Sequence, residues 1–165
     1  MEPVLLDLPA LSVVGVRVVG KPKELGKKVP EAWSRLRERL GEIPGVVDPA
    51  WQIGFLVPKE HALPLGRLAT YIGVEVSGET PDLPKDLRRQ EWPAARYAEF
   101  RYTGSFLAPE FAGFYPAMFA ALKEHGLAMH PELGWQEHYA DATHDWSDKA
   151  AATNTLVVRF PLAEG

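Results

Sequence analysis

The chain has 165 residues, of which 46% are hydrophobic and 10% aromatic, and its formal net charge is −4. This length suits one domain or two small fused halves, and so apolar a composition excludes a disordered chain. The acidic balance argues against nucleic acid as a direct partner, because phosphate backbones require a concentrated basic surface, and the absence of cysteine excludes disulfides and a thiolate nucleophile.

The first half of the chain predicts a strand, a helix and two further strands. The predicted elements are a strand at 11–19, a lysine-rich solvated loop at 21–28, a helix at 29–40 and strands at 51–57 and 68–77. Trp33 lies on the apolar face of the helix, Pro30 suits its first turn, and Gly41 suits its end. Together these elements form a βαββ unit over about residues 8–78.

A polar segment with two prolines, at about residues 79–91, predicts a linker. The order then repeats over about residues 92–163. The predicted elements are a strand at 94–103, a helix that ends near His125 with Gly126 as its cap, and strands at 134–140 and 154–161. The inward face of this second helix would carry Tyr115, Met118, Phe119 and Leu122.

Two landmarks recur at an offset of 84 residues: Trp51-Gln52 returns as Trp135-Gln136, and Gly20 returns as Gly104. The apolar phase of two further strands matches at the same offset. We therefore expect an α+β fold of duplicated βαββ halves in a single domain over 1–165. It would have antiparallel sheets and one main helix per half. One unit alone buries its sheet poorly, so the halves would share a core and leave a ligand groove between them.

The strongest candidate site lies on the third strand of the second half. Alternation places Trp135, Glu137 and Tyr139 on one face, which lodges a carboxylate between two aromatic rings. Such a carboxylate gains from a cationic or proton-donating ligand, and the rings add cation–π attraction. The alternative interpretation is a strand-edge glutamate paired with an arginine.

Other aromatic residues are weaker candidates for the groove. Tyr71 is predicted on the strand face that no helix covers, either lining the groove or exposed. Trp33 is favoured as core, and Trp92 and Tyr97 fit lining or core equally. Trp146 lies in a polar loop over 141–149, from which it would fold over the groove as a lid.

A metal site is an alternative interpretation of the same polar loop. His138, Asp141, His144 and Asp145 are suitable ligand types, but their spacing matches no metal motif, and His138 alternates away from Glu137. We therefore predict neither a metal nor a cofactor.

Over its full length the chain resembles the GyrI-like small-molecule-binding domains, the effector-binding modules of AraC-type and MerR-type regulators. The resemblance rests on three segments in order: 95–100 (ARYAEF), 136–139 (QEHY) and 156–162 (LVVRFPL). It implies that an acid on the third strand of the second half, here Glu137, meets lipophilic cations. It also implies aromatic groove walls, for which the nearest residues are Tyr71, Trp135, Tyr139 and Tyr97.

The sequence also departs from the family. Thr155 stands where many relatives have an acid, and a strand that begins by residue 11 leaves no room for a helix-turn-helix, so a standalone form is expected.

Three functions follow from the resemblance. The first is binding of a hydrophobic, cationic small molecule. The second is hydrolysis of strained, cyclopropane-type electrophiles, with Glu137 as general acid or base and Tyr71 or Tyr139 as donor. The third is a gyrase-inhibitor-like module that binds a protein partner. No run approaches the roughly 20 apolar residues that span a bilayer. We therefore expect a cytoplasmic protein with no membrane contact and no direct nucleic-acid contact.

Overall fold

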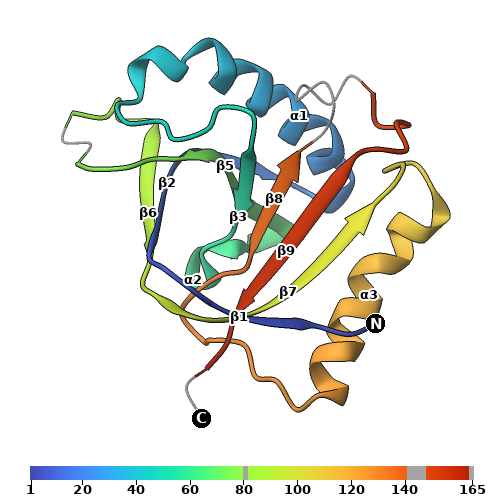
Figure 1. Cartoon of the computed structure of the whole chain (residues 1–165). Coiled ribbons are helices and arrows are strands. Elements are labelled where there is room, and N and C mark those ends of the chain that lie inside the picture. Colours follow the sequence, from blue (N-terminus) through green and yellow to red (C-terminus); the bar gives the residue numbers. More distant parts are fainter. Residues whose placement is uncertain (80–81, 141–147, 164–165) are drawn as a thin grey trace.

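The computed structural model describes residues 1–79, 82–140 and 148–163, and its strands join into one antiparallel sheet (Figure 1). The strand order is β1-β7-β9-β8-β3-β5-β2-β6, with β4 beside β5. The strands are β1 (Val4–Leu8), β2 (Leu11–Gly20), β3 (Gln52–Phe55), β4 (Ala62–Leu63), β5 (Arg67–Glu75), β6 (Leu87–Trp92), β7 (Ala95–Thr103), β8 (Gln136–Ala140) and β9 (Thr155–Pro161). The helices are α1 (Pro22–Glu38), η1 (Leu40–Glu42), α2 (Pro58–His61), η2 (Pro64–Gly66) and α3 (Pro109–Glu124). The α+β class is confirmed.

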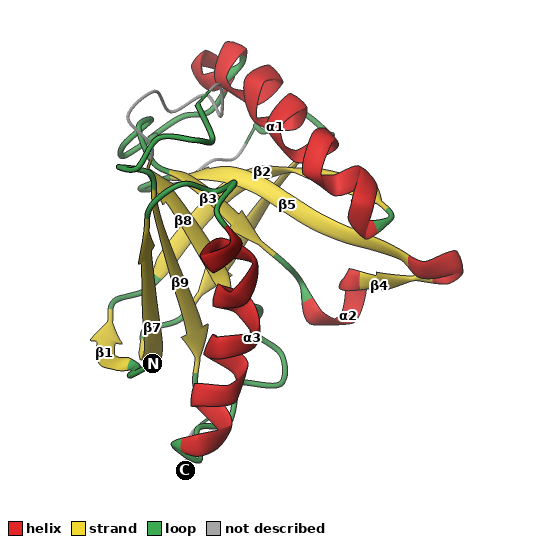
Figure 2. Cartoon of the chain, turned by 90° about the vertical axis from the view of Figure 1, so that its right-hand side faces the viewer, coloured by secondary structure: helices red, strands yellow, loops and turns green. Residues whose placement is uncertain are grey.

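The two long helices, α1 and α3, pack against the same face of the sheet, which we call the helix face (Figure 2). Trp33 of α1 packs with Val14 and Ile72, and Met118 of α3 packs with Val158. The strand order places β2 and β5 under α1, and β7 and β9 under α3. The middle strands β3 and β8 therefore lie between the helices.

The opposite face is concave because the sheet curls on itself. Strands β1 and β2 lie near opposite ends of the sheet order, yet only Pro9 and Ala10 separate them in the chain. Likewise, only Pro93 and Ala94 separate β6 from β7. These links hold the two ends of the sheet together. We call the enclosed side the concave face.

The concave face has its own apolar core. Phe55 stacks on Tyr71 with ring centroids 4.9 Å apart, and the edge of Trp92 meets Phe55 at 5.2 Å. The indole Nε1 of Trp92 donates to the carbonyl oxygen of Gly134 at 3.0 Å. Tyr71 and Trp92 are therefore structural members of this core.

Close approach between β2 and β5 requires glycine. Gly15 faces Gly73 across the strands, and a Cβ on Gly15 would lie 2.7 Å from the carbonyl oxygen of Ile72. A Cβ on Gly73 would overlap the carbonyl oxygen of Val14. Backbone atoms leave no room to relax by a rotamer change, so the two glycines permit the tight packing of these strands.

We expect Gly73→Ala to destabilise the protein by about 1–3 kcal/mol, because the added methyl group forces the two strands apart. Urea unfolding measures this change. Gly113→Ala is the matched control: it lies in α3 with nothing within 4 Å of its added Cβ, so it should leave stability unchanged or raise it. Equal stability of Gly73→Ala and wild type would contradict the packing described.

His138, buried on the concave face, should make stability depend on pH. Burial, reinforced by the charge of Arg159, lowers its pKa from 6.5 to about 3. Between these values the unfolded chain binds a proton that the folded chain does not, so stability falls as pH falls below 6.5. His138→Gln should reduce this slope by about 1.4 kcal/mol per pH unit in urea titrations between about pH 6 and 5.

Three predicted boundaries are wrong. The segment predicted as a lysine-rich loop forms the first turns of α1, which begins at Pro22, so Pro30 lies inside the helix. The backbone N–H of Lys21 donates to Glu24 Oε2 at 2.7 Å, which secures this earlier start. The end of the predicted linker is strand β6, which pairs with β2, and β1 precedes the first predicted strand.

The Trp-Gln landmark does not mark equivalent positions. Residues one apart on a strand point to opposite faces. Trp51 lines a cavity on the concave face, whereas Trp135 lines one on the helix face. In the outer strands the offset preserves the face, as for Ile72 and Leu156, which both pack under helices. The duplication therefore stays a prediction about element order.

Candidate functional site

A cavity of about 390 Å³ opens on the helix face, above β3 and β8 and between α1 and α3. This volume lies within the range of about 300–1,000 Å³ typical of small-molecule sites. Its lining is mostly apolar and aromatic. It comprises Leu25, Gly26, Val29, Pro30, Gly54, Phe55, Leu56, His61, Thr70, Ile72, Phe106, Leu107, Phe111, Trp135, Glu137, Tyr139 and Lys149.

Glu137 of β8 is the acidic residue of this lining. Its Oε2 accepts a hydrogen bond from the Tyr139 hydroxyl at 2.7 Å. Its Oε1 accepts one from the Tyr115 hydroxyl at 3.0 Å and one from Trp135 Nε1 at 3.3 Å. Three neutral donors thus hold the carboxylate in one orientation.

Both tyrosines remain protonated donors. Burial, and then the charge of Glu137, raise the pKa of Tyr115 and Tyr139 well above the usual phenol value. Among the salt bridges between described residues, none includes Glu137. The predicted alternative, a strand-edge glutamate paired with an arginine, is therefore wrong. No salt bridge between described residues pairs this carboxylate with a cationic side chain, although Lys149 also lines the cavity.

Gly54 keeps space open beside this carboxylate. It faces Glu137 across β3 and β8 and faces Ile72 across β3 and β5. A Cβ on Gly54 would lie 3.6 Å from Glu137 Oε2 and 3.7 Å from Ile72 Cδ1, which is ordinary contact. Neither backbone conformation nor crowding requires glycine here. The backbone of Gly54 instead forms part of the cavity floor, and the absence of a side chain leaves the space above it open.

Trp135 forms a wall between two cavities. Its ring contacts Phe119 at 5.8 Å and Phe160 at 5.7 Å between centroids. It lines the cavity beside Glu137 and also a second one of about 350 Å³, which includes Pro58, Met129 and Pro161. An aromatic wall with a bonded N–H can pack against ligand rings without losing its orientation.

The structure brings Glu137, Trp135 and Tyr139 together as predicted. Trp33 of α1 is fully buried between its helix and the sheet, in agreement with the core interpretation. Trp146 lies outside the described residues, as do Asp141, His144 and Asp145.

The other predicted groove residues, Tyr71, Trp92 and Tyr97, lie on the concave face and not in the cavity beside Glu137. The Tyr71 hydroxyl donates to Glu60 Oε2 at 2.8 Å and accepts from Arg88 at 3.0 Å. Trp92 belongs to the same apolar core, and Tyr97 lines a separate cavity. These residues alternate away from the helix face, because both helices cover the opposite side of their strands.

Sequence reasoning missed Tyr115 and Gly54 as site residues. Helical periodicity placed Tyr115 on the inward face of its helix, but its contact with Glu137 depends on how α3 docks on the sheet. Gly54 was one glycine within a short strand. The strand register that sets it opposite Glu137 is a long-range feature with no local signal.

Tyr139 and Glu137 should be energetically coupled. We expect Tyr139→Phe to cost about 1–3 kcal/mol of stability at neutral pH, because a carboxylate oxygen loses its closest donor. In the Glu137→Gln background the same change should cost less. Urea unfolding of the two single variants and the double variant gives the coupling energy. Additive costs would show that the hydrogen bond contributes nothing.

The fold and this cavity together define a small-molecule-binding domain of the α+β class. The family model of the GyrI-like small molecule binding domain matches residues 1–156, and the chain belongs to this family. No curated protein matches the chain significantly. Among the described residues, no helix has the length and apolarity needed to cross a membrane.

Solved structures share the fold at low sequence identity. SAV2435 bound to tetraphenylphosphonium matches with a TM-score of 0.68 at 15% identity, over 99% of this chain and 94% of that one. The EcmrR C-terminal domain matches with a TM-score of 0.69 at 16% identity, over 99% and 98%. A hydrolase encoded by lin2189 from Listeria innocua matches with a TM-score of 0.55 at 15% identity, over 98% and 92%.

Proposed function

We propose that this protein binds hydrophobic organic cations in the cavity between α1 and α3, with Glu137 as the charge partner. The observation that carries the proposal is the carboxylate itself. It is partly buried, held by Tyr115, Tyr139 and Trp135, and has no ion pair among the described salt bridges. An entering cation would supply this carboxylate with a partner of opposite charge inside the cavity.

The surrounding side chains support a lipophilic ligand. Phe106, Phe111 and Trp135 line the cavity with aromatic surface, and Leu25 and Val29 of α1 add aliphatic surface. Aromatic rings attract cations by about 0.5–2 kcal/mol each when well placed. A delocalised cation carrying aryl groups fits these features better than a small, strongly hydrated ion, which would lose its water on entry.

Titration calorimetry with tetraphenylphosphonium and its uncharged analogue triphenylphosphine oxide tests the proposal. We expect saturable binding of the cation and binding of the neutral compound that is weaker by about tenfold or more. Equal affinity for both compounds would show that charge does not select the ligand. Action on a protein partner and residence in the cytoplasm stay predictions.

Hydrolysis of a strained electrophile is the second candidate. The hydroxyl of Tyr139, 2.7 Å from Glu137, puts a proton donor beside a potential general base, as acid–base hydrolysis requires. Incubation with a cyclopropane-bearing electrophile, followed by mass spectrometry, would detect the added water. Product formed by wild type and lost in Glu137→Gln would favour this reaction over binding alone.

A further inference from the structure

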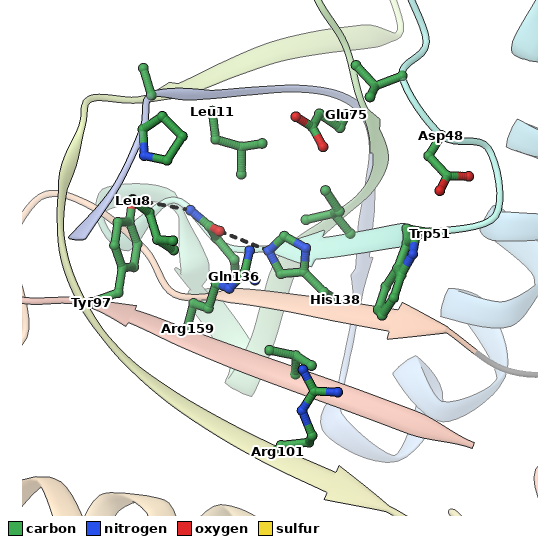
Figure 3. A pocket seen from close by; sticks show the side chains of 15 residues that line it. Leu8, Leu11, Asp48, Trp51, Glu75, Tyr97, Arg101, Gln136, His138 and Arg159 are labelled. Atoms are coloured by element: carbon green, nitrogen blue, oxygen red, sulfur yellow. Dashed lines mark hydrogen bonds between the residues drawn. The ribbon is translucent and has the colours of Figure 1, made fainter. Parts of the chain in front are cut away.

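The concave face carries a further cavity, of about 450 Å³ (Figure 3). It lies on the opposite side of β8 from Glu137, because Gln136 and His138, which line it, alternate with Glu137 along the strand. Its floor is polar and buried: Gln136 and His138 of β8 are 1% and 8% exposed. The β1–β2 link, with Leu8 and Leu11, lies along one rim, and the half-buried Trp51 lies at another. The polar side chains that line this cavity do not line the cavity beside Glu137, and the reverse also holds. The two sites are therefore chemically separate.

His138 offers an unused acceptor to this cavity. Its Nε2 lies 2.9 Å from Gln136 Oε1, which can only accept, so Nε2 must donate. Gln136 in turn donates from Nε2 to the Tyr97 hydroxyl at 3.5 Å. The imidazole is neutral, so its Nδ1 carries a lone pair, and no hydrogen bond between described residues uses it. A buried ring with a free acceptor at a cavity wall is suited to a ligand N–H or O–H.

Charges of opposite sign flank this floor. On the β9 and β7 side lie Arg159 and Arg101, which share Glu99 at 2.9 Å and 3.9 Å, so the three side chains retain one net positive charge. On the β5 side lies Glu75, which has no ion pair among the described salt bridges. Figure 3 shows Glu75 across the cavity from Arg159 and Arg101, with His138 between.

The spacing favours a ligand longer than a free amino acid. Neighbouring strands lie about 4.8 Å apart, and β8 and β3 separate β9 from β5, so the two charged sides are at most about 14 Å apart at the backbone, measured along the sheet. Side chains reaching inward from both sides leave room for a molecule several bonds long. A dipeptide presents an ammonium group, an amide N–H and a carboxylate in that order, which matches Glu75, His138 and Arg159.

We propose that the concave face binds a dipeptide-like zwitterion, with Glu75 on its ammonium group, His138 Nδ1 on its amide N–H and Arg159 on its carboxylate. Apolar ligand side chains would contact Leu11, Ile53 and Val157. This site acts independently of Glu137, which lies on the helix face.

Calorimetry with L-alanyl-L-leucine, its N-acetyl form and its C-terminal amide tests the proposal. We expect the free dipeptide to bind and each blocked form to bind about tenfold more weakly, because each loses one charged contact. Glu75→Gln should abolish the preference over the N-acetyl form. Arg159→Gln should abolish the preference over the amide. Glu137→Gln is the matched control and should bind the dipeptide as wild type does.

Arg159→Gln also breaks the bond to Glu99, so its fold must be checked by thermal unfolding. Glu75→Gln breaks no side-chain hydrogen bond or ion pair among the described residues, so it keeps the test decisive if the arginine variant unfolds. No binding of the dipeptide at millimolar concentration, or equal binding of all three forms, would overturn the proposal. Loss of dipeptide binding in Glu137→Gln with retention in Glu75→Gln would also overturn it, by placing the ligand on the other face.

Discussion

Glu137→Gln is expected to weaken tetraphenylphosphonium binding by about 10–100-fold while leaving the fold intact. Two unit charges 4 Å apart interact by about 4 kcal/mol at an effective dielectric constant of 20, and the cost of desolvation offsets part of this. The remaining loss corresponds to one or two factors of ten in the dissociation constant. Glutamine keeps the shape, and its single amide oxygen can still accept from Tyr115 and Trp135, while its NH2 group faces the Tyr139 hydroxyl, which must then accept. The change therefore removes the charge and reverses one hydrogen bond.

Two controls separate charge from damage to the site. Glu75→Gln removes a half-buried acid from the concave face and should leave tetraphenylphosphonium binding unchanged. Triphenylphosphine oxide should bind wild type and Glu137→Gln with similar affinity, because it carries no charge for the carboxylate to recognise. If Glu137→Gln weakened the neutral compound as much as the cation, the loss would come from altered shape.

Gly54→Leu is expected to weaken binding by about 100-fold or more, because its side chain would occupy the cavity floor next to the carboxylate. The added Cβ meets Glu137 and Ile72 only at ordinary contact distances, and Gly54 lines the cavity, so the remaining atoms can extend into it. Stability should therefore change little, in contrast to Gly73→Ala. Calorimetry with tetraphenylphosphonium and thermal unfolding measure the two quantities.

Gly54→Ala should cause a smaller loss of tetraphenylphosphonium affinity. Its single methyl group fits beside Glu137 Oε2 at 3.6 Å, so the cavity loses only a small part of its floor. Affinity should fall between those of wild type and Gly54→Leu. Full affinity in the leucine variant would mean that ligands do not use the space above β3.

Local periodicity was sufficient to predict the centre of the site. Trp135, Glu137 and Tyr139 alternate along one strand, so their shared face follows from the sequence alone. Which face of a strand the helices cover depends instead on strand order and on the curl of the whole sheet. Tyr71 therefore lies on the face that no helix covers, as predicted, but that face is the opposite one from Glu137, and Tyr97 lies on it too.

The sequence contains a signal for the start of α1 that conflicts with the loop predicted there. Pro22 at the first turn and Glu24 two residues later are typical of a helix start, yet the surrounding lysines suggested a solvated loop. The lysines are compatible with a helix because they lie on its exposed side, as the partial exposure of Lys27 and Lys28 indicates. By contrast, no local feature marks Tyr115 as a hydrogen-bond donor to Glu137, because that contact joins α3 to β8 across the core.

A crystal structure of the protein with tetraphenylphosphonium bound tests the central proposal most directly. We predict the phosphonium centre between α1 and α3, with aryl groups against Trp135 and Phe111 and the positive charge facing the Glu137 carboxylate. A ligand found instead in the concave cavity, beside Gln136 and His138, would contradict the assignment of the cation site to the helix face.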